Sequence, residues 1–184
     1  QERKLGWHSQ PTAQVNFDGV RVPVENLVGA EGQGFGIAMA GLDGGRLNIG
    51  ACSLGGAQRC LDEAISYTRD REQFGKAVAE FQNTQFTLAD METELQAARM
   101  LLYAAAVKVT ENTPDKTRFA AMAKRLATDT GSAVADRALQ LHGGYGYLMD
   151  YPVERFWRDL RVHSILEGTN QIMRMIVGRE ILRP

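Results

Sequence analysis

The segment Ile165–Met173 carries the residue types best suited to chemistry on carbon. Glu167 follows an isoleucine and a leucine and precedes a glycine. Burial among apolar side chains disfavours a charged carboxylate and makes it a better proton acceptor. Gly168 allows a ligand to approach the backbone closely. The pattern predicts a general base at Glu167, although the same residues are also typical of a turn into a helix capped by Thr169 or Asn170.

Three further groups of residues suit an anionic ligand. Arg71 offers a guanidinium that could bind a pyrophosphate, although from spacing alone a helix end is the favoured interpretation. In Gln140–Gly144 the glycine amides could meet an anion, and Gly143 is equally typical of a helix C-cap. Asp43 and Arg46 are one helical turn apart, which suits an exposed ion pair as well as a ligand contact.

The bulk composition excludes several classes of protein. The 184 residues suffice for one domain, alone or with part of a second. With 21 Lys and Arg against 22 Asp and Glu, the net charge of −1 offers no field for nucleic acid. No apolar run is long enough to span a bilayer, so we expect a soluble chain that binds no membrane. Cys52 and Cys60 are too far apart along one predicted helix for a disulfide, which favours reduced thiols in a reducing compartment.

Helical periodicity dominates after residue 30. The sequence predicts long helices over 34–69, 84–111 and from about 116 to 141, and a last helix over 169–182. Apolar residues mark the inward face of the second helix: Leu88, Met91, Leu95, Ala98, Leu102, Ala105 and Val109. The inward face predicted for the third comprises Phe119, Met122, Leu126, Thr130, Ala133 and Leu141. The many glycines between 41 and 56 predict close packing or a neighbouring ligand, because each is costly inside a helix.

The first 30 residues have a different pattern. Apolar and polar residues alternate over 12–17, and Asp18–Gly19 then precedes an extended stretch. This pattern predicts a short β remnant ahead of an all-α bundle of long antiparallel helices. The chain does not begin with methionine, which suggests a fragment or a processed protein.

Five motifs together resemble the acyl-CoA dehydrogenase family in order and spacing, and the resemblance covers essentially the whole chain. They are Gly41–Arg46, Arg71–Gly75, Phe81–Gln82, Gln140–Gly146 and Ile165–Asn170. The resemblance implies that residues 1–30 end the middle β domain of such a protein. Residues 31–184 would be its C-terminal four-helix domain. The first domain and most of the middle domain would lie outside this chain, so we expect the isolated chain to be inactive.

The resemblance also implies a reaction. Glu167 would remove the α-proton of an acyl-CoA while the β-carbon transfers hydride to FAD, which yields a 2-enoyl-CoA. The backbone N–H of Glu167 and a flavin ribityl hydroxyl would stabilise the charge that develops on the thioester oxygen. The stretches Gly6–Thr12, Asn48–Gly55 and Arg161–Glu167 resemble most the family members that act on a short branched substrate, isobutyryl-CoA, an intermediate of valine degradation. Butyryl- and 2-methylbutyryl-CoA are alternatives, and a non-catalytic helical oligomerisation scaffold is an alternative of another class.

Family contacts transfer to matching positions of this sequence. The flavin contacts would be Arg71, Gln73, Phe74, Gln82, Gln140, Gly143, Gly144, Thr169 and Gln171. The substrate contacts would be Asp43, Arg46, Gly168 and Arg179. Because flavin is shared between subunits in this family, the resemblance implies a homotetramer built as a dimer of dimers. It also implies electron-transfer flavoprotein as a partner, in a bacterial cytoplasm or a mitochondrial matrix. No metal site is expected, since the three histidines have no ligands at metal spacing.

Overall fold

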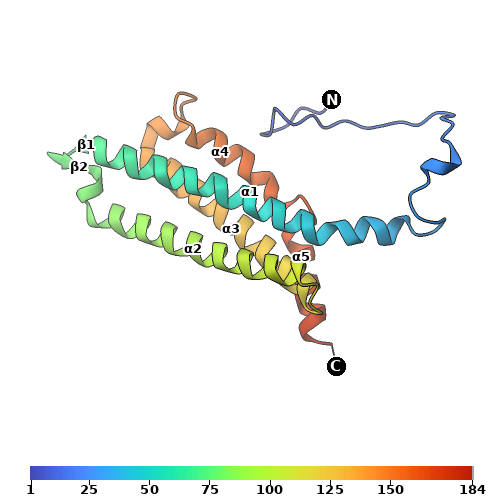
Figure 1. Ribbon diagram of the computed structural model, residues 1–184. Helices are drawn as coiled ribbons and strands as arrows, with labels where there is room; N and C mark the ends of the chain where they lie inside the picture. Colours follow the sequence, from blue (N-terminus) through green and yellow to red (C-terminus); the bar gives the residue numbers. More distant parts are fainter. Residues whose placement is uncertain (184) are drawn as a thin grey trace.

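The computed structural model describes residues 1–183, and its main body is a bundle of helices (Figure 1). Three long helices lie side by side: α1 (Gly34–Asp70), α2 (Gln82–Thr110) and α3 (Lys116–His142). The fourth side of the bundle is formed by two shorter helices, α4 (Val153–Leu160) and α5 (Asn170–Ile181). Helix α3 contacts the four others and is the centre of the domain. The predicted all-α bundle is confirmed.

The core follows the predicted stripe of α2 but not that of α3. Met91, Leu95, Ala98, Leu102 and Ala105 of α2 are buried as expected. In α3 the buried face consists mainly of small residues: Ala120, Ala123, Ala127, Gly131, Val134, Ala135 and Ala138. Leu126 was expected to face inward but is 39% exposed, and most of its predicted partners lie at the edge of the core. Small side chains let the central helix approach its neighbours on several sides, so the larger ones lie at its flanks.

Helix α1 uses its glycines for close contacts. A Cβ at Gly50 would lie 3.0 Å from Leu102 Cδ1 in α2, and one at Gly56 would lie 2.8 Å from Leu160 Cδ2 in α4. The prediction of close packing is therefore confirmed at these positions. Gly41, Gly44 and Gly55 have no neighbour within 4 Å of such a Cβ among the described residues.

Short elements connect the long helices. Strands β1 (Glu72–Gln73) and β2 (Lys76–Ala77) form an antiparallel hairpin in which Glu72 pairs with Ala77, and Gln73 with Lys76. The two turn residues, Phe74 and Gly75, have φ values of +54° and +80°, as in a type I′ turn. The 3₁₀ helix η2 (Val78–Glu80) leads into α2. Beyond α3, η3 (Gly143–Tyr147) leads to α4, and η4 (Arg161–Ser164) lies between α4 and the loop before α5.

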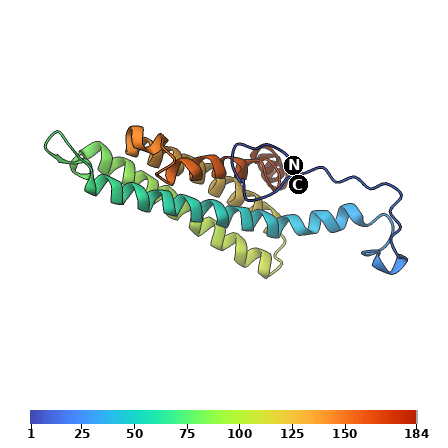
Figure 2. The same cartoon turned by 90° about the horizontal axis from the view of Figure 1, so that it is seen from above.

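The first 33 residues run along and then away from the bundle (Figures 1 and 2). They contain a short 3₁₀ helix, η1 (Val24–Asn26), and no strand. Residues 11–40 are exposed throughout, with Phe17 81% and Phe35 77% exposed. The predicted strand pattern over 12–17 is thus wrong for this chain, because a strand requires a partner to accept its hydrogen bonds. The assignment of residues 1–30 to a middle domain stays a prediction.

The described residues bear on three further expectations, which concern membrane-spanning helices, metal sites and disulfides. Among residues 1–183, no helix has both the length and the apolar content needed to cross a bilayer. The same residues contain no cluster of three or more metal-binding side chains. Cys52 and Cys60 are both free, as the helical spacing predicted.

Candidate active site

Glu167 lies in the tight loop between η4 and α5. Its φ is +54° and that of Gly168 is +90°, so two consecutive residues adopt the left-handed conformation. A side chain at Gly168 would collide with Met173, since a Cβ there would lie 2.8 Å from Met173 Cε. The loop therefore requires glycine after the proposed base. A non-glycine residue with positive φ is uncommon, and such strain concentrates at functional sites.

The carboxylate of Glu167 lies directly against the backbone of α1. A Cβ at Gly45 would be 2.7 Å from Glu167 Cδ, so a glycine is required for this approach. Glu167 is half-buried, whereas Ile165 is 53% exposed. The expected enclosure by the preceding apolar pair is therefore incomplete. The backbone of α1 supplies the cover instead.

The predicted substrate residues Asp43 and Arg46 flank Gly45 on α1. They form an ion pair of 2.8 Å, and Thr117 Oγ1 donates a second hydrogen bond of 2.7 Å to Asp43. Arg46 is 6% exposed, so of the two interpretations left open the exposed pair does not apply: the pair is held between α1 and α3. Within residues 1–183, Arg46 Nε is buried and has no hydrogen-bond partner. Arg179 is exposed in the last turn of α5, about 14 Å along the helix from its start.

Lys124 is a functional candidate that sequence reasoning missed. It is fully buried in α3, and its Nζ donates to the Gly168 carbonyl at 2.8 Å and to Asn170 Oδ1 at 2.9 Å. Burial lowers the pKa of its ammonium to about 8. The nearby Asp129 carboxylate partly offsets this effect, because it raises the pKa. The sequence carried a signal, because Lys124 shares the helical face of Ala120 and Ala127. A lysine on an otherwise apolar stripe is rarely buried without a partner.

A cleft at the opposite end of α1 collects other predicted residues. This cleft of about 450 Å³ is lined by Arg71, Gln73, Gln140, Gly143 and Gly144, five of the nine predicted flavin contacts. Arg71 caps α1, and its guanidinium carbon lies 5.5 Å from the centre of the Tyr145 ring.

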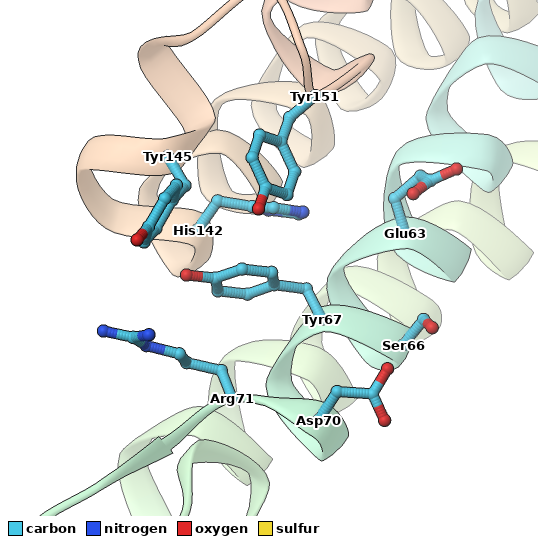
Figure 3. Close-up of a pocket in the computed structure, with 8 residues that line it drawn as sticks. All are labelled: Glu63, Ser66, Tyr67, Asp70, Arg71, His142, Tyr145 and Tyr151. Carbon is cyan, nitrogen blue, oxygen red and sulfur yellow. The ribbon is translucent and has the colours of Figure 1, made fainter.

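Aromatic rings line both this cleft and the adjoining pocket that Figure 3 shows. Tyr67 stacks on His142 with ring centroids 4.3 Å apart, and Tyr151 meets Tyr67 edge-on at 5.9 Å. Burial raises the pKa of Tyr67, while Arg71 opposes this effect. The end of α1 thus presents a guanidinium, rings and amides in one place.

The remaining predicted contacts lie outside this cleft. Phe74 is 93% exposed at the tip of the hairpin, and Gln82 is exposed at the start of α2. Thr169 is confirmed as the N-cap of α5, since its Oγ1 accepts a hydrogen bond of 3.4 Å from Ile172 N, and Gln171 is exposed beside it. Gly143 also acts as the helix cap that its position predicted, with φ +58°.

The candidate residues therefore form two groups. Gly45, which touches the base, and Arg71 are 26 residues apart on one helix and its cap. At 1.5 Å per residue, this corresponds to about 39 Å. A ligand that contacts both groups of a single chain would have to span this separation. An ordinary small-molecule pocket is only roughly 10 Å across.

Comparisons with known proteins identify the family of this chain. The sequence profile described as "Acyl-CoA dehydrogenase, C-terminal domain" matches residues 32–182. A mitochondrial isobutyryl-CoA dehydrogenase of Dictyostelium discoideum is 54% identical over 98% of this chain and 43% of its own length. The caffeyl-CoA reductase–Etf complex subunit CarC of Acetobacterium woodii is 43% identical over 99% of this chain and 48% of its own length.

A solved structure shows the same fold. Butyryl-CoA dehydrogenase from Megasphaera elsdenii superimposes with a TM-score of 0.95 and 46% identity, covering 99% of this chain and 47% of that one. This chain thus spans less than half the length of the relatives that it matches. The profile match and the identities over nearly the whole chain establish that the chain belongs to the acyl-CoA dehydrogenase family.

Proposed function

We propose that this chain is the C-terminal part of a flavin-dependent acyl-CoA dehydrogenase that acts on a short branched acyl-CoA, with isobutyryl-CoA as the expected substrate. The observation that carries the proposal is the placement of Glu167. Its carboxylate is half-buried against the Gly45 backbone, and Glu167 itself has a positive φ, which is unfavourable for a non-glycine residue. A carboxylate held in one direction in a partly dry site is suited to removing a proton from carbon.

In this reaction the Glu167 carboxylate takes the α-proton of the thioester. The electron pair of the broken Cα–H bond forms the Cα–Cβ double bond as the β-hydrogen leaves as hydride. The chemistry that FAD supplies when bound is acceptance of this hydride. The backbone N–H of Glu167 is expected to donate to the thioester oxygen, where negative charge develops. Asp43, Arg46, Gly168 and Arg179 are proposed to contact the substrate.

The residues of the cleft that contains Arg71, at the end of α1, fit an anionic cofactor such as FAD. Arg71 provides a guanidinium suited to phosphate oxygens, and Gly143 and Gly144 have open space where side chains would otherwise stand. Gln73, Phe74, Gln82 and Gln140 extend this group, whereas Thr169 and Gln171 lie at the Glu167 end. This division supports a flavin held between two subunits.

Self-association has independent support from the surface of α2. Met100, Tyr103 and Val107 recur at helical spacing and are 57%, 58% and 54% exposed. A contiguous exposed apolar stripe is typical of a protein interface. We propose a dimer of dimers in the whole protein, with electron-transfer flavoprotein as the electron acceptor. The Acetobacterium relative is named as a subunit of an Etf complex, which supports that partner.

The test of the base uses Glu167→Gln in the full-length protein. We expect FAD to stay bound and kcat to fall by about 10³-fold, since positioned proton transfer contributes roughly 10²–10⁴-fold. Isobutyryl-CoA should bleach the visible flavin band of the wild type and not that of the variant. Glu111→Gln, at the exposed end of α2, is the control and should behave as wild type. Turnover of Glu167→Gln within a few-fold of wild type would rule out this base.

Two further measurements separate the alternatives. Comparing kcat/KM for isobutyryl-, butyryl- and 2-methylbutyryl-CoA tests the acyl group, and a tenfold preference for either of the last two would replace isobutyryl-CoA. The non-catalytic scaffold predicts a colourless full-length protein that takes up no added FAD. A yellow protein that bleaches with substrate contradicts the scaffold.

A further inference from the structure

Lys124 is a buried charge that the proposed reaction does not use. Its side chain has no solvent exposure, and it lies on the alanine-lined face of α3 that meets α5. A buried ammonium is unfavourable unless hydrogen bonds and opposite charges compensate for its lost hydration. The partners of Lys124 therefore indicate what the charge is for.

These partners lie on both sides of Thr169, in the loop that carries Glu167. The ammonium donates to the main-chain carbonyl of Gly168 at 2.8 Å and to Asn170 Oδ1 at 2.9 Å. Asn170 is itself held from its other end, because its Nδ2 donates to Asp129 Oδ1 at 2.7 Å and to Thr128 Oγ1 at 3.0 Å. Helix α3 thus fixes the start of α5 through one connected set of hydrogen bonds.

The chain between this anchor and the base is too short to move independently. Gly168 directly follows Glu167, and the next residue, Thr169, is constrained as the N-cap of α5. The positive φ of Glu167 is a conformation that must be imposed by the surroundings. A charged donor on the Gly168 carbonyl fixes the adjacent peptide group and supplies that constraint.

We infer that Lys124 is the positioning residue of the Glu167 turn: it holds the Gly168 carbonyl and Asn170 from α3, so that the base faces α1 at Gly45. This inference rests on the proposed function for its catalytic meaning, but the clamp is a property of the fold. Lys124 touches neither substrate nor cofactor in this role. It acts through the backbone of the next element.

The first test is Lys124→Met in the full-length protein, a change that keeps length and apolar volume but removes the charge. We expect kcat for isobutyryl-CoA to fall by about 100-fold, with a much smaller change in KM, because a displacement of about 1 Å can cost that much. Lys116→Met, at the first position of the same helix, is the matched control and should leave kcat unchanged. A Lys124→Met kcat within threefold of wild type would overturn the inference.

The second measurement does not depend on activity. Amide hydrogen exchange should be at least about tenfold faster at residues 168–172 in Lys124→Met, because the anchored loop opens locally. Amides in the middle of α2 should be unchanged. Asn170→Ala, which removes one of the two anchors, should speed exchange at the same amides to a smaller extent. Unchanged exchange at 168–172 in Lys124→Met overturns the inference, even if the variant is less active.

The pH profile adds a third readout. Burial lowers the pKa of Lys124 to about 8, Asp129 and Glu167 raise it, and Arg46 lowers it. The wild-type kcat should therefore decline above about pH 8, as the clamp loses its charge, and Lys124→Met should lack this limb. A limb that is identical in both proteins would overturn the assignment to Lys124. If exchange responds as expected but the wild type dehydrogenates no acyl-CoA, the proposed function fails and the clamp remains.

Discussion

Gly45 matters at the residue scale because a side chain there would occupy the position of the Glu167 carboxylate. Three residues meet in a few ångströms: Gly45 from α1, Glu167 from the loop, and Gly168, whose carbonyl is held by Lys124. Gly45 and Gly168 contribute space and backbone conformation, and Glu167 carries the proposed reactive group. The direction of the base is thus set by residues distant in the sequence.

Gly45→Ala is expected to impair catalysis without unfolding the protein. Its methyl group would lie 2.7 Å from Glu167 Cδ and would push the carboxylate away from α1. In the full-length protein, kcat should fall by about 100-fold while the flavin spectrum stays normal. Gly44→Ala is the control, since no atom lies within 4 Å of a Cβ there, and it should raise stability by about 1 kcal/mol. Equal kcat values for the two variants would contradict the geometry of this site.

The sequence allowed the base to be predicted but not its support. Glu167 stands out because a carboxylate beside glycine in an apolar run has few structural uses. Lys124 was missed, since its partners come from residues more than 40 positions away. The apolar cover expected from Ile165 did not form, because local sequence does not reveal which helix will lie alongside.

At the scale of elements, helical periodicity predicts the buried face of a helix that packs on one side. The stripe of α2 is apolar on one side, so its buried face follows from the spacing. Helix α3 is packed on several sides, and small residues decide its orientation, so the larger apolar residues misled the prediction. The alternation over 12–17 resembles a strand, but a strand forms only where a second strand pairs with it.

The short helix η4 is held against the N-terminal segment by a titratable group. His163 is 3% exposed, meets the Trp7 ring edge-on at 5.3 Å, and has no hydrogen bond at either ring nitrogen within residues 1–183. Burial lowers its pKa to about 4, the Asp159 carboxylate opposes this shift, and the Lys124 ammonium adds to it. The folded chain therefore prefers the neutral ring.

His163 is expected to make the protein acid-sensitive. Its contribution to the free energy of unfolding is complete above pH 6.5 and is lost as the pH falls towards 4, because the unfolded chain binds the proton first. A shift from 6.5 to about 4 corresponds to about 3 kcal/mol. His163→Phe keeps a ring against Trp7 and should lose less thermal stability than wild type between pH 7 and pH 4.5. Parallel losses in the two proteins would contradict this assignment.

At the scale of the whole molecule, the length of α1 separates the two halves of the proposed site. Glu167 lies against α1 at Gly45, about three turns from the start of the helix, whereas the cleft with Arg71 lies at its C-terminal end. The distance of about 39 Å is fixed by helix geometry and does not change with loop movement. We therefore expect a complete site in the whole protein to take its two halves from different subunits.

Mixing two inactive variants should therefore restore activity. Full-length Glu167→Gln and Arg71→Ala subunits, co-expressed with different tags, would form hybrids in which one site has both wild-type residues. We expect up to about a quarter of wild-type activity, since half of random dimers are hybrids and each has one intact site. The control is co-expression of Glu167→Gln with a subunit that carries both changes, which contains no intact site. Purified hybrids without activity would contradict the sharing of sites between subunits.

The buried ammonium of Lys124 has a consequence for attempts to engineer this protein. Replacing a buried charge by a well-packed apolar residue is often neutral or favourable for folding. A screen for heat resistance alone would therefore tend to enrich apolar residues at this position. The surviving variants would be robust yet poor catalysts, because the selection would have removed the anchor that aims the reactive carboxylate.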